Sequence, residues 1–291
     1  MKSEPGALIK AIKEKGMSIE AEMSFFDHLD VLRGHLIRAS IAIVIFAVAA
    51  FSYYSFIFDE IIMGPGRVDF WTYRMMCAAV AKFSLGPEFC VTRLNYEIIN
   101  TELGGQFTLQ LNSSLMIGII LGVPYLLFEI WRFVKPALHE NERKSAAGFV
   151  FWASLLFIIG LLFGYYIVSP LSVNFLTNFE VSKIINNKIT IDSYFSIIAT
   201  LSIGSAITFE LPTVVFILSK LGIMTPQFMR ASRRYSTVII LIIAAIVTPT
   251  PDLIIMLTVS LPLFLLYEVS IYISAMVMGG KEKAEKEFYA G

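Results

Sequence analysis

Long uninterrupted apolar runs dominate the pattern of this sequence, and short polar stretches separate them. A helix needs roughly 20 apolar residues to cross about 30 Å of hydrocarbon. Five runs reach or approach that length, and they cover residues 36–58, 113–133, 146–168, 195–218 and 253–273. We interpret each of them as a membrane-spanning helix.

A sixth apolar run, residues 235–247, is shorter. Its 13 residues would cover only about 20 Å at a rise of 1.5 Å per residue. Arg233 and Arg234 precede it, and a turn with two prolines that ends at Asp252 follows it, where proline stops a helix. We therefore expect an all-α, polytopic integral membrane protein with six transmembrane helices, of which the fifth and sixth are short.

The composition agrees with a membrane protein. The hydrophobic share is 56% and the charged share 16%, whereas a soluble domain has roughly 45–50% apolar and about 25% charged residues. The 23 basic and 23 acidic residues cancel, so no nucleic-acid partner is expected. The sequence contains no phosphate-binding glycine loop and no His/Cys cluster at metal-ligand spacing. We expect no cofactor and no metal.

The basic residues are unevenly distributed between alternate connectors. Of the 23 Lys and Arg residues, 17 lie in the N-terminal segment, in the connectors after the second and fourth runs and in the tail, and 6 lie on the opposite side. Positively charged loops stay in the cytoplasm. This bias predicts a cytoplasmic (inner) membrane protein with both termini cytoplasmic.

These boundaries divide the chain into three parts. Residues 1–23 form a cytoplasmic N-terminal extension, residues 24–275 form the membrane domain with an external loop at 59–107, and residues 276–291 form a cytoplasmic tail. The external loop contains the only two cysteines, Cys77 and Cys90. In an oxidising exterior they could form a disulfide; the alternative is two buried free thiols.

Glu210 is the most unusual charged residue, because it lies well inside the fourth apolar run. A charged side chain at the centre of a membrane helix costs on the order of 2.5–3.5 kcal/mol on insertion scales, so it usually faces a polar cavity or a partner. We therefore interpret Glu210 as a functional intramembrane site. Glu129 and Glu268 lie near the inner ends of their runs, where a carboxylate can reach interfacial water, and we interpret both as structural.

Several short motifs occur in a specific order along the chain. They are HLDVLR at 28–33, FVKPAL at 133–138 followed by Glu142, FELP at 209–212, RRY at 233–235 and TPTPD at 248–252. As a set, from about residue 24 to 275, they resemble the C subunit of the twin-arginine protein translocase (TatC). The resemblance implies a six-helix receptor, not an enzyme, that binds twin-arginine signal peptides and exports folded proteins with the proton-motive force.

The resemblance also implies a signal-peptide site at the cytoplasmic face. Glu142 is the acid expected to meet the arginine pair of the signal, because a guanidinium pairs bidentately with a carboxylate. The other positions that match this site are Phe133, Pro136, Leu138, Arg33 and Asp30. Relatives carry an acid where this chain has Val31, and the sequence leaves open whether Asp27 or Asp30 replaces it.

Further positions match two other regions of the family. Glu210, Asp252 and Met256 match an intramembrane polar site where partner subunits dock, and Pro65 and Phe107 match positions that shape the external cap. The partners implied are single-span translocase subunits of the TatA/TatB type and further copies in a membrane oligomer. The copy number, the substrate set and the presence of a separate TatB-type partner stay open.

A proton-coupled small-solute transporter that uses Glu210 as its carrier is the alternative function. Such transporters are typically built from inverted repeats. This sequence shows no internal repeat and its fifth span is short. Both observations favour the translocase.

Overall fold

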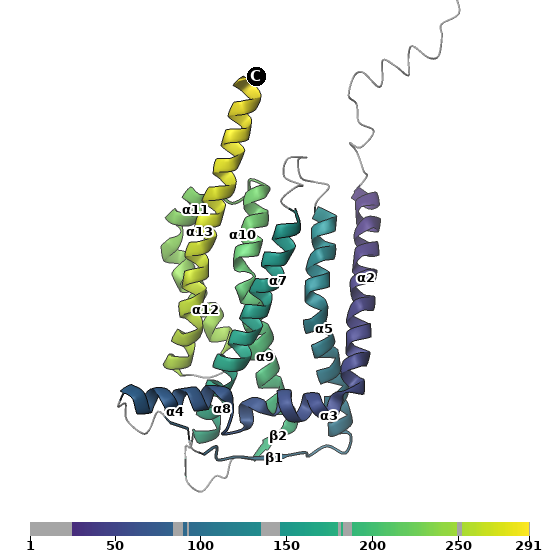
Figure 1. Ribbon diagram of the computed structural model, residues 1–291, viewed down its shortest axis with the longest axis vertical. Helices are drawn as coiled ribbons and strands as arrows, with labels where there is room; N and C mark the ends of the chain where they lie inside the picture. Colours follow the sequence, from purple (N-terminus) through teal and green to yellow (C-terminus); the bar gives the residue numbers. More distant parts are fainter. Residues whose placement is uncertain are drawn as a thin grey trace, which may run out of the picture.

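The fold is given by a computed structural model, which describes residues 25–83, 90–91, 93–134, 146–179, 182, 188–248 and 252–290. The long helices run side by side as a bundle, and short elements lie across one end of it (Figure 1). We call the end at which α2 begins and α13 ends the upper end, and the end with the short elements the lower end. The described chain therefore starts and finishes on the same side of the bundle.

The helices follow the apolar runs. The helices that run along the bundle are α2 (Phe25–Ser52), α5 (Gly105–Val134), α7 (Ala146–Phe163), α9 (Ile191–Phe209), α10 (Leu211–Lys220), α12 (Arg233–Val247) and α13 (Leu253–Ala290). The shorter elements are α3 (Tyr54–Phe56), η1 (Ile57–Ile62), η2 (Gly64–Gly66), α4 (Trp71–Phe83), η5 (Gly164–Val168), α8 (Ser169–Asn178) and α11 (Pro226–Ala231). Two strands, β1 (Glu97–Ile99) and β2 (Lys188–Thr190), complete the described elements.

Five helical stretches of the described chain are long and apolar enough to cross a membrane. They are Val31–Ser52, Gly105–Phe133, Val150–Asn178, Ile191–Lys220 and Leu253–Gly280. The short apolar run at 235–247, the fifth predicted span in chain order, corresponds to α12, whose 15 residues cover only about 22 Å at 1.5 Å per residue. The expected short fifth helix is thus present as a helix, and it is shorter than a full span.

Some boundaries differ from the sequence prediction. Helix α2 starts at Phe25 and ends at Ser52, so the motif before the first span continues into it without a break, and residues 54–58 lie in α3 and η1. Helix α13 continues to Ala290, through the residues expected to form a separate tail. The expectation that the sixth helix is short is therefore wrong, because its apolar part alone covers Leu253–Gly280. Local hydropathy marks where a helix enters lipid, but a polar segment without proline can extend the same helix.

The all-α expectation misses one small feature. β1 and β2 pair in parallel at the lower end, with Glu97 opposite Lys188, and these two side chains form an ion pair of 3.5 Å. Strands of three residues carry no alternating pattern long enough to be recognised in a sequence. The pair joins the segment before α5 to the segment before α9.

Helix α2 packs mainly on α5. The approach is close at Gly118 of α5, where a side chain would have no room, because a Cβ there would lie 2.7 Å from the Ala47 backbone nitrogen and from the Ile43 carbonyl oxygen of α2. Small residues allow such close packing in membranes, where lipid tails are as apolar as the helix surface. The rest of α2 is largely open, with Ile45 and Val48 each 62% exposed.

The fourth span is interrupted at Glu210. Helix α9 ends at Phe209 and α10 starts at Leu211, with Pro212 in its first turn. Proline removes a backbone donor and its ring clashes with the preceding turn. The interruption therefore places the Glu210 side chain where the regular helix is broken.

Candidate functional site

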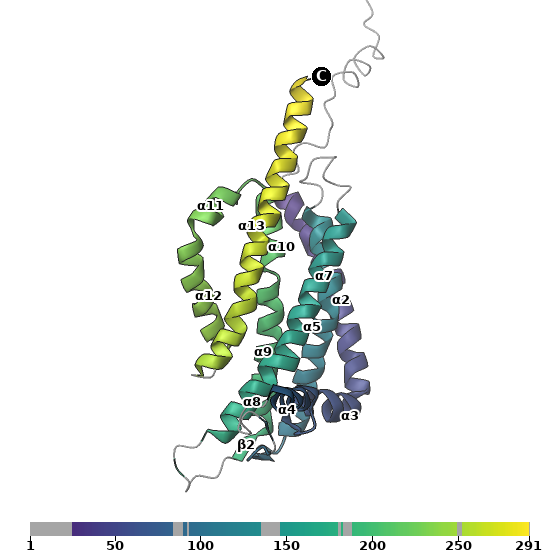
Figure 2. The ribbon, with the colours of Figure 1, turned by 60° about the vertical axis from the view of Figure 1, so that its left-hand side comes forward.

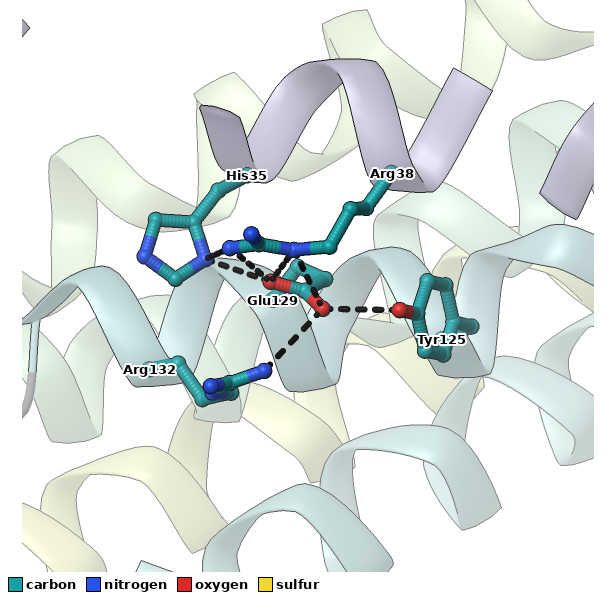
Figure 3. Close-up of polar contacts among 5 residues, drawn as sticks. All are labelled: His35, Arg38, Tyr125, Glu129 and Arg132. Atoms are coloured by element: carbon teal, nitrogen blue, oxygen red, sulfur yellow. Dashed lines mark hydrogen bonds and ion pairs between the residues drawn. The ribbon is translucent and has the colours of Figure 1, made fainter. Parts of the chain in front are cut away.

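A polar cluster lies between α2 and α5 near the upper end of the bundle (Figure 3). We name it the Glu129 cluster, and it consists of His35, Arg38, Tyr125, Glu129 and Arg132. His35 and Arg38 are one turn apart on α2. Tyr125, Glu129 and Arg132 follow one another at intervals of one turn on α5. Spacings of three and four place side chains on one helix face, so each helix presents its polar residues to the other.

The carboxylate of Glu129 is the centre of this cluster. Its Oε1 accepts a hydrogen bond of 2.8 Å from the Tyr125 hydroxyl and a contact of 3.4 Å from Arg132 Nη1. The guanidinium of Arg38 reaches both oxygens at 3.3–3.4 Å through Nε and Nη2. His35 Nδ1 contacts Oε2.

The proton on His35 can be placed by the partners of Nδ1. Glu129 as a carboxylate can only accept, so Nδ1 must carry the hydrogen that it donates to Oε2. Arg38 Nη2 lies 3.0 Å from the same nitrogen, but a protonated Nδ1 cannot accept from it. The Arg38 guanidinium therefore directs its hydrogen bonds to Glu129.

Burial explains why so many donors converge there. Glu129 is 1% exposed, and a buried carboxylate is costly unless it is paired and hydrogen-bonded. The side chains of Arg38 and Arg132 are 47% and 50% exposed, so each reaches inward from the surface. The expectation of a structural role for Glu129 agrees with this arrangement, but the sequence did not indicate its partners on α2.

The described signal-peptide residues lie nearer the upper end than this cluster, one on each helix. Arg33 is exposed on α2, and the half-buried ring of Phe133, near the end of α5, meets the His35 ring edge-on with centroids 6.3 Å apart. Asp30 belongs to α2, but its side chain is outside the described part of the structure. The predicted residues Pro136, Leu138 and Glu142 also lie outside the described residues.

Glu210 occupies a different environment. Both of its carboxylate oxygens are buried, and neither makes a hydrogen bond among the described residues. The Thr213 side chain is near enough to influence the carboxyl group, although the two do not form a hydrogen bond of good geometry. Glu268 provides a contrast, because its carboxylate is 54% exposed and pairs with Arg233 of α12 at 2.7 Å.

A groove of about 410 Å³ opens beside the interrupted span. Helices α11 and α12 stand apart from α10 and pack on α13, and α12 also contacts α9 (Figure 2). The lining is mostly apolar and includes Thr208, Leu211, Phe228, Ile239, Leu263 and Tyr267. Thr208 and Leu211 flank Glu210 in the sequence, but Glu210 itself does not line the groove.

Asp252 and Met256 lie at the start of α13. The Asp252 carboxylate accepts a hydrogen bond of 2.8 Å from the Ile254 backbone N–H. This is the contact by which an acidic side chain caps a helix N-terminus. Met256 is half-buried and packs against a central core cluster that includes Val259 and Leu263. Both residues thus have a structural role in addition to the predicted partner role.

The described part of the loop that was predicted to be external lies at the lower end of the bundle. Cys77 and Cys90 are joined by a disulfide, which is the pairing expected from the sequence. Pro65 is fully buried, and its carbonyl accepts a 3.1 Å hydrogen bond from the Tyr73 hydroxyl. Burial raises the pKa of Tyr73 above its ordinary value, which keeps this donor protonated. Phe107, by contrast, is 62% exposed.

The family comparisons agree on one assignment. A family model described as "Sec-independent protein translocase protein (TatC)" matches residues 27–262. A TatC protein of Blattabacterium sp. subsp. Periplaneta americana is 35% identical over 88% of this chain and 96% of its own length. The protein TatCy of Bacillus subtilis is 34% identical over 87% of this chain and 89% of its own length.

Solved structures give the same result. A crystal structure titled twin arginine translocase receptor TatC superimposes with a TM-score of 0.62 at 28% identity, over 86% of this chain and 99% of that one. A second crystal structure of a TatC in the detergent DDM gives a TM-score of 0.65 at 30% identity, over 85% and 99%. The fold, the sequence and the order of the motifs lead to one conclusion: this multi-pass membrane protein belongs to the TatC family of Sec-independent protein translocase proteins.

Proposed function

We propose that this chain is the receptor component of a twin-arginine translocase and that it binds twin-arginine signal peptides at the upper end of the bundle. The observation that carries this proposal is that the helix ends which flank the predicted site residues lie at the same end of the bundle. Helix α5 ends at Val134 beside the upper part of α2, and α7 begins at Ala146 beside α5 (Figure 1). The connector that contains Glu142 therefore joins two helices at the same end of the bundle as the segment that contains Arg33.

The chemistry suits an arginine pair. Glu142 would accept both guanidinium groups, because a carboxylate and a guanidinium match bidentately and attract strongly near a low-dielectric interface. Phe133, Pro136 and Leu138 would form the apolar part of the same site. Val31 is 39% exposed at the position where relatives carry an acid, so this chain depends more on Glu142, with Asp30 or Asp27 as the second acid.

We propose six crossings of the bacterial cytoplasmic membrane, with both termini in the cytoplasm. The described chain begins and ends at the upper end, and the excess of Lys and Arg lies in the segments assigned to that side. Helix α12 would be the short fifth crossing. Reporter fusions after Lys82 and after Lys281 should then score external and internal, respectively, and an external C-terminus would contradict this topology.

The unpaired carboxylate of Glu210 supports a role in assembly. We assign to Glu210, Asp252 and Met256 the contact with single-span TatA/TatB-type subunits or with an inserted signal. A polar group that reached Glu210 would supply the hydrogen bonds that it lacks within the described chain. Pro65 and Phe107 would maintain the cap. The transport of folded proteins would use the proton-motive force. The family assignment leaves no support for a small-solute transporter.

Photo-crosslinking tests the receptor function directly. A photoreactive residue at position 142, in native membranes, should crosslink to a twin-arginine signal peptide and fail to crosslink to a twin-lysine version. The same probe at position 140 is the matched control and should label the signal more weakly. Equal labelling of both peptides from position 142 would contradict the proposed site.

A further inference from the structure

The Glu129 cluster lies just below the two described parts of the proposed signal-peptide site, between the two helices that carry them. Arg33 comes two residues before His35 on α2, and Phe133 comes four residues after Glu129 on α5. The ring contact between His35 and Phe133 connects the cluster to the site itself. Any movement of the upper end of α2 relative to α5 would therefore change the distance between Arg33 and Phe133.

Helix α2 has little else to hold that distance. Its main packing partner is α5, and its outward residues are exposed, with Ile41 and Val44 at 54% and 56%. The close approach at Gly118 lies roughly four helical turns below the upper end of α5. Apolar packing has no preferred direction, so it resists separation of two helices more than it resists sliding or rotation.

Charge-assisted hydrogen bonds, unlike apolar packing, can fix how α2 is rotated and how far it slides against α5. They depend on both distance and angle, and they are stronger than neutral ones. Glu129 receives them from His35 and Arg38 on one helix and from Tyr125 and Arg132 on the other. A carboxylate that is 1% exposed cannot exchange these partners for water.

We propose that Glu129 is a positioning residue for signal recognition: its carboxylate fixes the rotation and height of the upper end of α2 against α5 and so sets the spacing of the signal-peptide site. The proposal rests on the proposed receptor function. The locking of the two helices is nevertheless a property of this chain alone, and it can be measured without any signal peptide.

The test uses the full-length protein in lipid nanodiscs, with spin labels on two pairs of exposed positions. Leu36→Cys with Ile130→Cys reports on the upper end, and Val48→Cys with Leu111→Cys reports on the lower half as a reference. The native cysteines are joined in a disulfide and do not take the label. Electron paramagnetic resonance gives the distance distributions, and titration with a twin-arginine signal peptide gives the affinity.

Glu129→Gln keeps the size of the side chain and removes its charge. We expect the distance distribution of the upper pair to broaden and the lower pair to stay unchanged. Affinity for the signal should fall about tenfold, which lies within the usual range of coupling between two sites. Glu268→Gln, which also removes a carboxylate paired with an arginine, is the matched control and should change neither reading.

The outcomes separate the two proposals. If the wild type binds no twin-arginine signal, the receptor function is overturned. If Glu129→Gln still broadens the distance distribution of the upper label pair in that case, the positioning of α2 against α5 by Glu129 stands. Unchanged distances in Glu129→Gln, with or without a loss of affinity, would overturn the positioning role. If that variant does not accumulate, Arg38→Gln should give the same two changes and Arg38→Lys should restore both readings; identical readings for Gln and Lys would overturn the proposal.

Discussion

Glu129 and Glu210 are both acidic residues within apolar helices, and the fold treats them in opposite ways. Glu129 has hydrogen-bonding partners from two helices, whereas neither oxygen of Glu210 has a partner in the described chain. Hydrogen bonds within the fold offset the cost of burying the Glu129 carboxylate, whereas no hydrogen bond in the described chain offsets it for Glu210. Glu129 therefore belongs to the architecture, whereas the contact of Glu210 with a partner stays a proposal that rests on its unpaired oxygens.

The difference arises from what the neighbouring helices present. At Glu129 the facing helix carries two nitrogen-bearing side chains one turn apart, His35 and Arg38. At Glu210 the adjoining positions are Phe209, Leu211 and Pro212, and the nearby groove is mostly apolar. A partner for Glu210 must therefore come from outside the described residues.

The largest expected effect comes from Glu129→Leu. It leaves His35 and two arginines without their shared acceptor, and breaking a buried ion pair costs about 3–5 kcal/mol. We expect a loss of about 3 kcal/mol, because Arg38 and Arg132 are half-exposed and can reach water. Thermal unfolding of the purified protein in detergent measures it. An unchanged midpoint would remove the contrast with Glu210.

Glu142 is a third acidic residue to compare with Glu129 and Glu210, and it lies in the connector after the second predicted span instead of within a span. Glu142→Gln should weaken binding of a twin-arginine signal by about 1.5–3 kcal/mol, the scale of a hydrogen bond to a charged group, and leave membrane insertion unchanged. Glu142→Lys should be worse, because it repels the incoming arginines. Glu140→Lys is the control with a small effect. The receptor site is falsified if Glu142→Lys binds as tightly as the wild type in a calorimetric titration.

Glu210→Leu should change stability in the opposite direction to Glu129→Leu. Removing a buried, unpaired acceptor removes its desolvation penalty, on the order of 1–2 kcal/mol, so the unfolding midpoint should rise or stay level. Export of a twin-arginine substrate should be lost in the same variant. Normal export, measured by the appearance of the processed substrate outside the cytoplasm, would return Glu210 to a structural role.

The smallest effect is expected for Tyr125→Phe. It removes one donor of 2.8 Å to Glu129 and leaves the remaining donors in place, so stability should fall by about 0.5–1 kcal/mol. Combining it with Arg38→Gln should cost more than the sum of the two single changes, because both act on one carboxylate. Strict additivity in a double-mutant cycle would show that the cluster does not act as a unit.

Much of the fold could be predicted because it depends on local hydropathy. Each of the six apolar runs lies in helix over most of its length. The fourth run was expected to be one continuous helix, and its interruption at Glu210, two residues before Pro212, was not predicted. The paired strands could not be predicted, since Glu97 and Lys188 meet only after two helical stretches have been placed between them. The length of α13 beyond the membrane was missed for a related reason, because its polar end has no apolar period to follow.

The candidate site was predicted in part. The motifs identified the family, which the comparisons confirm, and the position of Glu210 inside an apolar run marked that residue as unusual. They did not select His35, Arg38 or Tyr125. The signal that could have found them is the one-turn spacing of polar residues within two otherwise apolar helices, although that spacing does not say which helices meet.

Hydrophobicity, charge and motif order are properties of neighbouring residues, so the amino-acid order alone was enough to identify the apolar segments, the charge bias and the family. Which buried acid is satisfied depended instead on tertiary packing. The α2 partners of Glu129 lie 94 and 91 residues before it in the chain, and the packing of α2 on α5 brings them together. A hydrogen bond acts over about 3 Å, so its partners are set by where the helices pack and not by their order in the chain.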